Sequence, residues 1–172
     1  SNPNPNALII NDVSKEILYE GKRIVKFGTS EYKYNNQGIR TYKLYKEYGP
    51  NGAQINQKEY NYILEGNRII KEILLNGYSL DYNYDLNGEL VGFNYNGVTY
   101  FYIKNILGII EKIIDESGNL MVSYTYDSWG KLLNKVASGI GVSSTIASIN
   151  PFIYKSYYYD YENEVYYLNS RY

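Results

Sequence analysis

The stretch YNYDLNGEL at positions 82–90 predicts the fold of this chain. Tyr82 and Tyr84 stand at alternate positions, and alternate side chains of a β-strand point to the same face of a sheet. The carboxylate of Asp85 can accept hydrogen bonds from backbone N–H groups two or three residues further on, which closes a turn. Gly88 fits the left-handed backbone position of a short hairpin loop. The stretch therefore predicts a strand, a tight turn and the start of a second strand.

Variants of this unit recur along the chain at intervals of roughly twenty residues, and such self-similarity is typical of repeat architectures. A second clear copy is YTYDSWGKL at positions 124–132, and looser copies begin at Tyr32, Tyr60 and Tyr100. Asn-Gly pairs, a strong hairpin signal, stand at positions 51–52, 76–77, 87–88 and 96–97. Because right-handed twist accumulates along a long strip of strands, we predict an all-β fold of antiparallel β-hairpin repeats that form a curved, twisted sheet.

The composition excludes several classes of chemistry. The 172 residues include 17 Lys and Arg against 18 Asp and Glu, a net charge of -1, whereas nucleic-acid binding needs a basic excess. Cysteine and histidine are absent, which excludes disulfides, zinc sites of the Cys/His type, Cys or Ser/His catalytic pairs and the usual haem ligands. The 24 tyrosines instead favour rings that pack across neighbouring strands. We therefore expect no catalytic residue, no cofactor and no metal site.

The ends of the chain and one segment without strand pattern complete the layout. Residues 1–16 begin with SNPNP and predict a disordered or tag-derived lead-in. The Gly/Ser/Ala-rich stretch that begins near Ala137 predicts a loop with one helical turn, within Ser143 to Ile149. Residues 157–168 predict a last hairpin, and we expect the chain to be a piece of a longer protein. No apolar run approaches the length of a membrane-spanning helix.

The ordered series of motifs resembles an Rhs/YD-repeat protein. The units at 82–88 and 124–130 are similar to the YD repeat, and the run from 100 to 131 is similar to the opening of the Rhs repeat-associated core. The segment NPFIYKSYYYD at 150–160, followed by YYLNSRY at 166–172, resembles the aromatic doublets that precede an Arg-Tyr pair in that core.

The resemblance divides the chain into two parts of different specificity. It predicts degenerate YD-type repeats over residues 17–77 and, over residues 78–172, YD repeats with a core that is truncated at its C-terminus. Asn35 and Ile63 follow tyrosine pairs where the family prefers aspartate. The turn from Asn163 onwards departs from the Thr-Gly type that is usual in the core.

The resemblance also implies a function. Such proteins form a long β-strip that spirals into a hollow shell around a variable C-terminal toxin domain. The expected function is a non-catalytic shell segment of an Rhs-type toxin carrier that encloses or presents a C-terminal effector domain. That attached toxin domain is the expected partner, and the parent is expected to be secreted or to lie at the bacterial cell surface or cell wall. The resemblance implies structural roles for the repeat residues Tyr82, Tyr84, Asp85, Gly88, Tyr100, Tyr102, Gly108, Tyr124, Tyr126, Asp127, Trp129, Gly130, Tyr166, Tyr167 and Arg171.

Other interpretations of the same residues stay open. Exposed tyrosines can stack on sugars, so the alternative function is a carbohydrate-binding or adhesion module whose partners are cell-wall or surface glycans. Asp115 and Glu116 could serve glycoside hydrolysis, but a carboxylate pair without a pocket pattern is typical of turns. Asp85 and Asp127 could hold calcium, yet no loop has the dense acidic spacing of a calcium site. Trp129 could mark a ligand site, whereas an aromatic residue before glycine is usual in the family.

Overall fold

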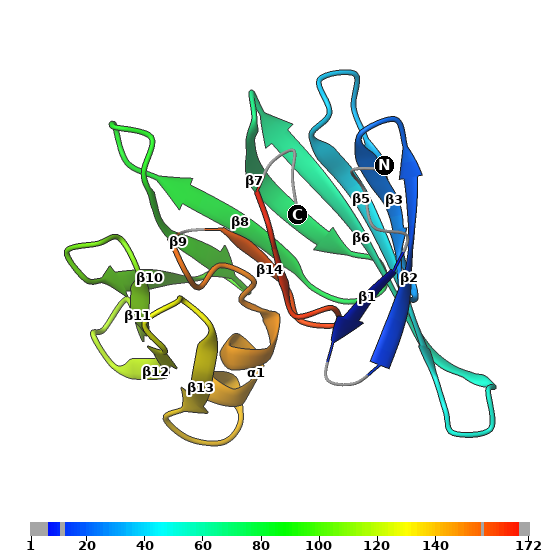
Figure 1. Cartoon of the computed structure of the whole chain (residues 1–172). Coiled ribbons are helices and arrows are strands. Elements are labelled where there is room, and N and C mark those ends of the chain that lie inside the picture. The colour runs from blue at the N-terminus through cyan, green and yellow to red at the C-terminus, as the bar shows by residue number, and fades with distance from the viewer. Residues whose placement is uncertain (1–6, 11–12, 156, 169–172) are drawn as a thin grey trace. The chain divides into compact units, whose positions relative to one another are not determined.

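The computed structural model of the chain describes residues 7–10, 13–155 and 157–168. The chain divides into two compact units, a first unit of Ser1–Ser79 with Asp160–Tyr172 and a second unit of Leu80–Tyr159. In both units, strands joined by tight turns make up most of the described chain (Figure 1). The prediction of an all-β fold built from antiparallel hairpins is confirmed.

The strands of the first unit pair in chain order, each antiparallel to the next. They are β1 (Ala7–Ile10), β2 (Val13–Glu20), β3 (Arg23–Phe27), β4 (Ser30–Tyr34), β5 (Arg40–Tyr48), β6 (Gln54–Glu65) and β7 (Arg68–Leu74). Strands therefore occupy part of residues 1–16, where the sequence predicts a lead-in. The predicted last hairpin is present as a two-stranded sheet of β14 (Tyr158–Asp160) and β15 (Val165–Tyr167).

The second unit repeats the same arrangement and adds a helix. Its strands also follow chain order and are β8 (Ser79–Tyr84), β9 (Leu90–Tyr95), β10 (Val98–Lys104), β11 (Ile110–Asp115), β12 (Leu120–Tyr126) and β13 (Leu132–Ala137). The helical turn predicted within Ser143 to Ile149 is present but longer than expected, because α1 (Val142–Ile149) is an α-helix of 8 residues. Ile146 and Ile149, three residues apart, are both buried. This burial stabilises a helix that the small polar residues around it do not predict.

One turn geometry recurs between the strands and explains the Tyr-Asp-Gly motif. The Asp85 carboxylate accepts hydrogen bonds from the backbone N–H groups of the second and fourth residues after it, both at 2.9 Å. The backbone N–H of Gly88 donates to the Asp85 carbonyl oxygen, and its φ of 81° lies in the left-handed region that favours glycine. The same contacts recur around Asp127, with Gly130 at a φ of 86°. Aspartate and glycine of both motif copies are thus turn residues.

Asparagine closes this turn as well as aspartate does. The Oδ1 atoms of Asn35 and Asn105 accept hydrogen bonds from the same two backbone positions, and so does the carboxylate of Asp115. An amide oxygen and a carboxylate oxygen are both acceptors at the same reach from the backbone. Asn35, which departs from the family preference for aspartate, therefore forms the same turn as Asp85.

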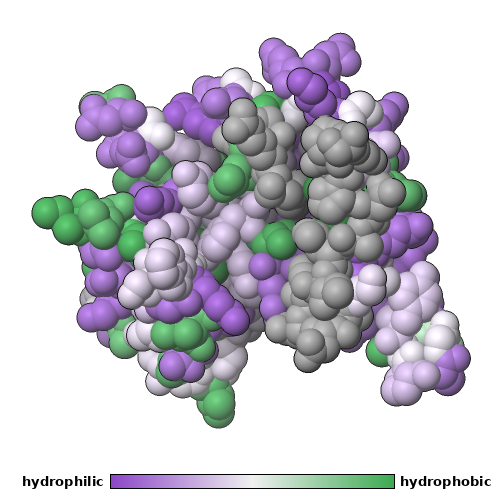
Figure 2. Space-filling view, viewed as in Figure 1, coloured by the Kyte–Doolittle hydropathy of each residue, from purple (hydrophilic) through white to green (hydrophobic). Residues whose placement is uncertain are grey.

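Each unit has a hydrophobic core of its own. In the first unit Ile17, Ile24, Phe27 and Tyr32 form a buried cluster. In the second unit the fully buried apolar side chains are Leu80, Phe93, Ile110, Ile113, Val122, Ile146 and Ile153. The surface seen in Figure 2 is largely hydrophilic or intermediate, with separate hydrophobic projections. No helix among the described residues is long and apolar enough to span a bilayer.

Candidate functional site

Two basic side chains of β5 are buried in the first unit. Arg40 and Lys43 are three residues apart, and in a regular strand side chains at that spacing point to opposite faces. The register between β4 and β5 shifts at Lys33 and Tyr34, and Tyr34 pairs with Arg40 at this β-bulge. A bulge re-aims side chains. Arg40 and Lys43 can therefore both be buried, and they are exposed by only 0% and 3%.

Acidic side chains near the C-terminus neutralise both cations. The Arg40 guanidinium donates to both carboxylate oxygens of Asp160, at 2.7 and 3.2 Å, and both side chains are fully buried. The Lys43 ammonium donates to Asp160 at 2.9 Å and lies 3.0 Å from a carboxylate oxygen of Glu162. Ionised, two-point hydrogen bonds of this kind are among the strongest in proteins. We call Arg40, Lys43, Asp160 and Glu162 the buried charge cluster.

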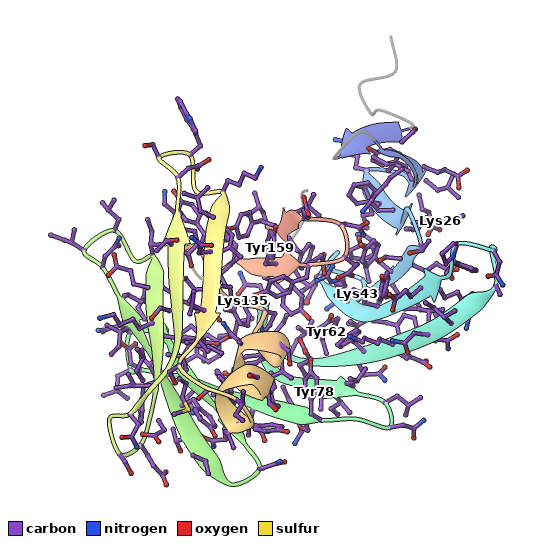
Figure 3. All side chains as sticks on the ribbon, turned by 90° about the horizontal axis from the view of Figure 1, so that it is seen from below. Lys26, Lys43, Tyr62, Tyr78, Lys135 and Tyr159 are labelled. Atoms are coloured by element: carbon purple, nitrogen blue, oxygen red, sulfur yellow. The ribbon has the colours of Figure 1, made fainter. Side chains whose placement is uncertain are left out.

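Tyrosine rings surround the two cations of this cluster. The Arg40 guanidinium carbon lies 4.3, 5.1 and 5.4 Å from the ring centres of Tyr167, Tyr32 and Tyr62. The Lys43 ammonium lies 4.6 Å from the ring centre of Tyr60. The face of an aromatic ring carries negative potential and attracts a cation. Figure 3 shows Lys43 and Tyr62 close to each other in the first unit.

Burial and charge have opposite effects on the ionisable groups of the cluster. Burial raises the pKa of the Asp160 carboxyl, but the charges of Arg40 and Lys43 outweigh this effect and hold that pKa below its ordinary value. Burial lowers the pKa of Lys43, but the nearby Asp160 carboxylate reverses the shift and the pKa lies well above its ordinary value. Burial also raises the pKa of Tyr62 far above its ordinary value. At neutral pH Asp160 and Lys43 are therefore ionised and Tyr62 is neutral, which suits a structural contact.

Asn163 fastens the turn that follows Asp160. Its side-chain amide nitrogen lies within 3.1–3.3 Å of three acceptors, the Phe27 carbonyl oxygen, the Ser30 hydroxyl and the Tyr32 hydroxyl. Lys15 donates to the Asn163 side-chain oxygen at 3.0 Å. The next residue, Glu164, has a φ of 55°, the backbone region that glycine occupies in a Thr-Gly turn. The departure from the usual core turn therefore adds an anchor to the first unit.

A second buried carboxylate lies on β7. Glu72 is 1% exposed and accepts a hydrogen bond of 3.0 Å from the Tyr78 hydroxyl. Burial and the charge of Glu72 raise the pKa of Tyr78 well above its ordinary value. Tyr78 therefore stays protonated and can keep donating to the carboxylate.

An aromatic row crosses three strands of the second unit. Phe93 of β9 pairs with Tyr82 of β8 and with Tyr100 of β10. The ring centres are 6.5 Å apart in the first pair and 5.4 Å apart in the second, which are favourable ring contacts. Each such cross-strand pair contributes about 0.2–1 kcal/mol. The predicted packing of tyrosines across strands is present, with Phe93 at its centre.

Asn150 joins the segment after α1 to this unit. It is fully buried, accepts a hydrogen bond of 2.6 Å from the Tyr102 hydroxyl and donates to the Tyr124 hydroxyl at 3.0 Å. Its amide also donates to the Phe152 carbonyl oxygen at 2.6 Å. The Asn-Pro-Phe segment thus holds two motif tyrosines through one amide group.

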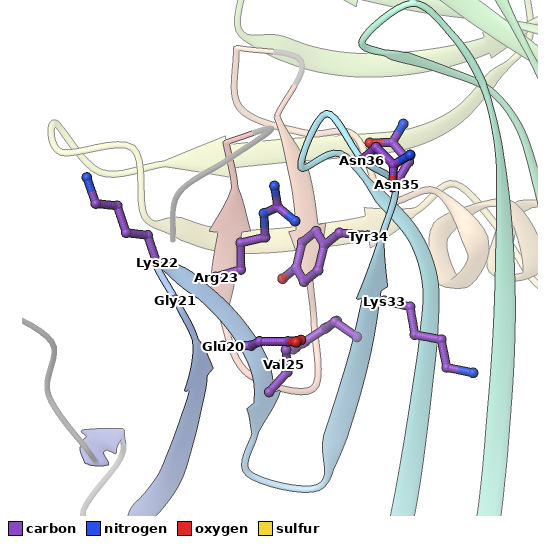
Figure 4. Close-up of a pocket in the computed structure, with 10 residues that line it drawn as sticks. Glu20, Gly21, Lys22, Arg23, Val25, Lys33, Tyr34, Asn35 and Asn36 are labelled. Carbon is purple, nitrogen blue, oxygen red and sulfur yellow. The ribbon is translucent and has the colours of Figure 1, made fainter.

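A polar hollow of about 660 Å³ opens in the first unit (Figure 4). Its lining includes Glu20, Lys22, Arg23, Lys33 and Tyr34. The Tyr34 hydroxyl donates to the Ile24 carbonyl oxygen at 2.5 Å, so it belongs to the wall of the hollow. The lining carries both signs of charge. In the part of the chain that the structure describes, no group of three or more Asp, Glu, His or Cys side chains could hold a metal ion.

The motif residues fall into four structural positions. Buried rings are Tyr82, Tyr100, Tyr102, Tyr124 and Tyr167, and half-buried rings are Tyr84, Tyr126 and Tyr166. Asp85, Asp127, Gly88, Gly108 and Gly130 stand in turns. Trp129 lies on a turn tip with its side chain 91% exposed, so it does not pack into the sheet. Arg171 lies outside the described residues.

Sequence reasoning missed the buried charge cluster, and it singled out Asn163 only as the start of an unusual turn and not as an anchor. The residues of the cluster are far apart in the sequence, and a lysine or arginine in a strand is normally read as solvent-exposed. The bulge next to Arg40 accompanies the Asx-Gly turn, as it does after Asp85, Asn105, Asp115 and Asp127, so the turn motif could have indicated it. Asp160 stands within the aromatic run that the resemblance picked out, and this was the one available hint.

Comparisons with known proteins agree with this architecture. No protein-family profile matches the chain. A tRNA3(Ser)-specific nuclease, WapA, of Bacillus spizizenii is 31% identical over 144 residues, which is 82% of this chain and 6% of that protein. The tRNA nuclease WapA of Bacillus subtilis strain 168 is 32% identical over the same share of each chain. The chain thus spans a small fraction of the curated relatives that it matches.

Solved structures match the fold over nearly the whole chain. The crystal structure of TcdB2-TccC3-Cdc42 has a TM-score of 0.71 and 14% identity, and covers 91% of this chain and 8% of that chain. TcdB2-TccC3 without its hypervariable C-terminal region has a TM-score of 0.70, 15% identity, and covers 92% of this chain and 8% of that chain. Together these findings support a relationship with Rhs/YD-repeat proteins.

Proposed function

We propose that this chain is a non-catalytic wall segment of an Rhs-type toxin carrier, which encloses or presents a C-terminal effector domain of a longer parent protein. The observation that carries the proposal is the sheet itself, in which successive hairpins pair in chain order within each unit and five connections have the same Asx-Gly turn. A strip built in this way can be lengthened by adding hairpins. The relatives that match are many times longer than the chain, as such a strip requires.

The polar chemistry of the first unit supports a structural role. The four members of the buried charge cluster bind one another, and Asn163 binds backbone and hydroxyl groups of β3 and β4. Charged side chains that are paired with one another in this way make a sheet more rigid. None of them is left as an unpaired acid or base for catalysis. The nuclease activity in the names of the relatives belongs to those whole proteins, and we assign it to a part of the parent other than this segment. The parent would act outside the cell or at its surface.

Protease protection of the longer parent tests this proposal. We expect the C-terminal domain of the parent to resist a protease that cleaves the same domain when it is expressed alone. Asp160→Asn, which breaks the buried charge cluster, should remove the protection, and Glu65→Gln at an exposed ion pair should preserve it. Equal cleavage of the domain in the parent and alone would overturn the carrier function.

The alternative of a glycan-binding module gains no specific support. It depends on exposed tyrosines, and the motif rings of Tyr82, Tyr100 and Tyr124 are buried with 3–6% exposure. The exposed rings among the described residues, Tyr48 and Tyr157, lie outside the motif residues. A cell-wall pulldown with the chain would detect such binding directly.

A further inference from the structure

Three turns of the second unit carry large apolar side chains that contact almost nothing. Leu86 and Ile106 are fully exposed, Trp129 is 91% exposed and Leu107 is 68% exposed. The tips lie in the turns between β8 and β9, between β10 and β11, and between β12 and β13. We call Leu86, Ile106, Leu107 and Trp129 the apolar rim. Figure 2 shows hydrophobic surface that projects at the left, on the side where Figure 1 draws the hairpins of the second unit.

The topology places these three turns at the same end of the strands. Strands of the second unit are antiparallel and follow chain order, so every second connection lies at the same end. Neighbouring turns at that end are two strands apart, which is about 10 Å. The opposite end of the strands carries Asn96 and Gly97 in one turn and Glu116 and Ser117 in the next. The turns at the opposite end of the strands are polar at their tips, although Ile140, which follows β13 at that end, is 96% exposed.

The apolar tips are not needed to form the turns. The same hydrogen-bonded turn has Asn36 and Gln37 at its tip in the first unit, and Glu116 and Ser117 in the second. The closing contacts come from the Asx side chain and the glycine, as described above. Exposed leucine, isoleucine and tryptophan at this position therefore point to a surface that is covered in use.

We propose that the apolar rim pairs with the apolar rim of a second copy of this chain. A twofold arrangement would place Trp129 against Leu86 of the partner subunit and the central pair against itself, because the three tips are evenly spaced. Four exposed side chains offer on the order of 600 Å² of apolar surface, close to the ~800 Å² per partner of a standard interface. The net charge of the whole chain is -1, so long-range repulsion between copies is small, whereas the acidic excess beside the tips opposes pairing at low salt and should make dimerisation stronger as salt is added.

The charges that flank the rim favour this occupant over a membrane. Acidic side chains outnumber basic ones beside the tips, with Asp85, Glu89, Glu111 and Asp127 against Lys104 and Lys131. Binding to an anionic bilayer requires a basic excess. The inference stands independently of the proposed carrier function.

The test uses the intact chain, in which Trp129 is the single tryptophan and therefore reports on the rim by its fluorescence. We expect a dimer in sedimentation equilibrium and a blue shift of tryptophan emission as the chain concentration rises. Leu86→Asn with Ile106→Asn should weaken dimerisation at least about tenfold, as substitution of central interface residues does. Trp129→Ala should weaken it to a similar extent, and the circular dichroism of both variants should be unchanged because the substituted side chains are exposed.

The matched control is Ile55→Asn, an exposed apolar residue of β6 in the first unit, which should leave the dimer intact. A monomeric wild-type chain, or a rim variant that associates as strongly as wild type, would overturn the proposal. A wild-type chain that stays monomeric but binds phosphatidylcholine vesicles through Trp129 would overturn it in favour of a lipid surface.

Discussion

Arg40 and Asp160 form a two-point ion pair with both side chains fully buried, although 120 residues separate them in the sequence. Removing two charges from water is costly, and the pair offsets this cost only because Lys43 and the surrounding tyrosine rings complete the contacts. The pair fastens the segment after Asp160 to β5. It therefore couples the end of the described chain to the first unit.

Breaking this pair should destabilise the fold strongly. Asp160→Asn leaves the charges of Arg40 and Lys43 buried without their carboxylate, so we expect a loss of about 3–5 kcal/mol in the free energy of unfolding. Urea denaturation followed by circular dichroism measures it. The control Glu65→Gln breaks the exposed ion pair with Arg68 and should change the stability by less than about 0.5 kcal/mol. A similar loss of unfolding free energy in both variants would contradict the inference that the buried charge cluster stabilises the fold.

Alkaline pH should unfold the protein through its buried tyrosines. Burial raises the pKa of Tyr60 to about 12, and those of Tyr32, Tyr62 and Tyr78 lie higher still. In the unfolded chain these groups lose their protons near pH 10. The contribution of these tyrosines to stability is then constant below about pH 10 and falls as the pH rises towards the folded-state values, by up to about 1.4 kcal/mol per tyrosine and pH unit.

Urea unfolding at several alkaline pH values, with tyrosinate absorbance recorded in parallel, measures this dependence. Tyr62→Phe should make the loss with pH shallower. Full ionisation of all tyrosines near pH 10 with the fold intact would contradict the burial of these rings.

The recurring turn should tolerate asparagine but not alanine. Asp85→Ala removes the acceptor of two backbone hydrogen bonds and should cost about 1 kcal/mol, since exposed hydrogen bonds contribute modestly. Asp85→Asn should stay within about 0.5 kcal/mol of wild type, because Asn35 and Asn105 make the same contacts. Thermal denaturation of the three proteins compares them. An equal loss in both variants would show that the carboxylate charge matters more than its hydrogen bonds.

Gly92 should not accept a side chain. A Cβ at this position in β9 would lie 2.0 Å from the Tyr100 carbonyl oxygen of the paired strand, and neither backbone can yield cheaply. We expect Gly92→Ala to cost at least about 2 kcal/mol in chemical denaturation. The matched control is Gly139→Ala, where a Cβ would meet nothing within 4 Å and the stability should change by less than about 1 kcal/mol. A neutral Gly92→Ala would rule out this close approach of the two strands.

The local part of the fold was predictable from the sequence because its causes are local. Tyr82 and Tyr84 share a face through the period of the strand, and Asp85 with Gly88 closes the turn within five residues. The sequence indicated only one turn of helix α1, because the stability of this helix comes from burial of Ile146 and Ile149 and its small polar residues carry a weak local signal.

By itself the sequence determined the strands, the turns and their repetition, because side chains alternate with a period of two in a strand and hydrogen bonds between residues two to four apart close the turns. Only the tertiary structure decided that Arg40, Lys43 and Asp160 meet in one buried cluster. That meeting depends on a β-bulge beside Arg40 and on the return of the chain after residue 159 to the first unit. The bulge recurs after the other Asx-Gly turns and is therefore local. The return of the chain has no local cause, since the energy of a buried ion pair exists only when both partners have left water together.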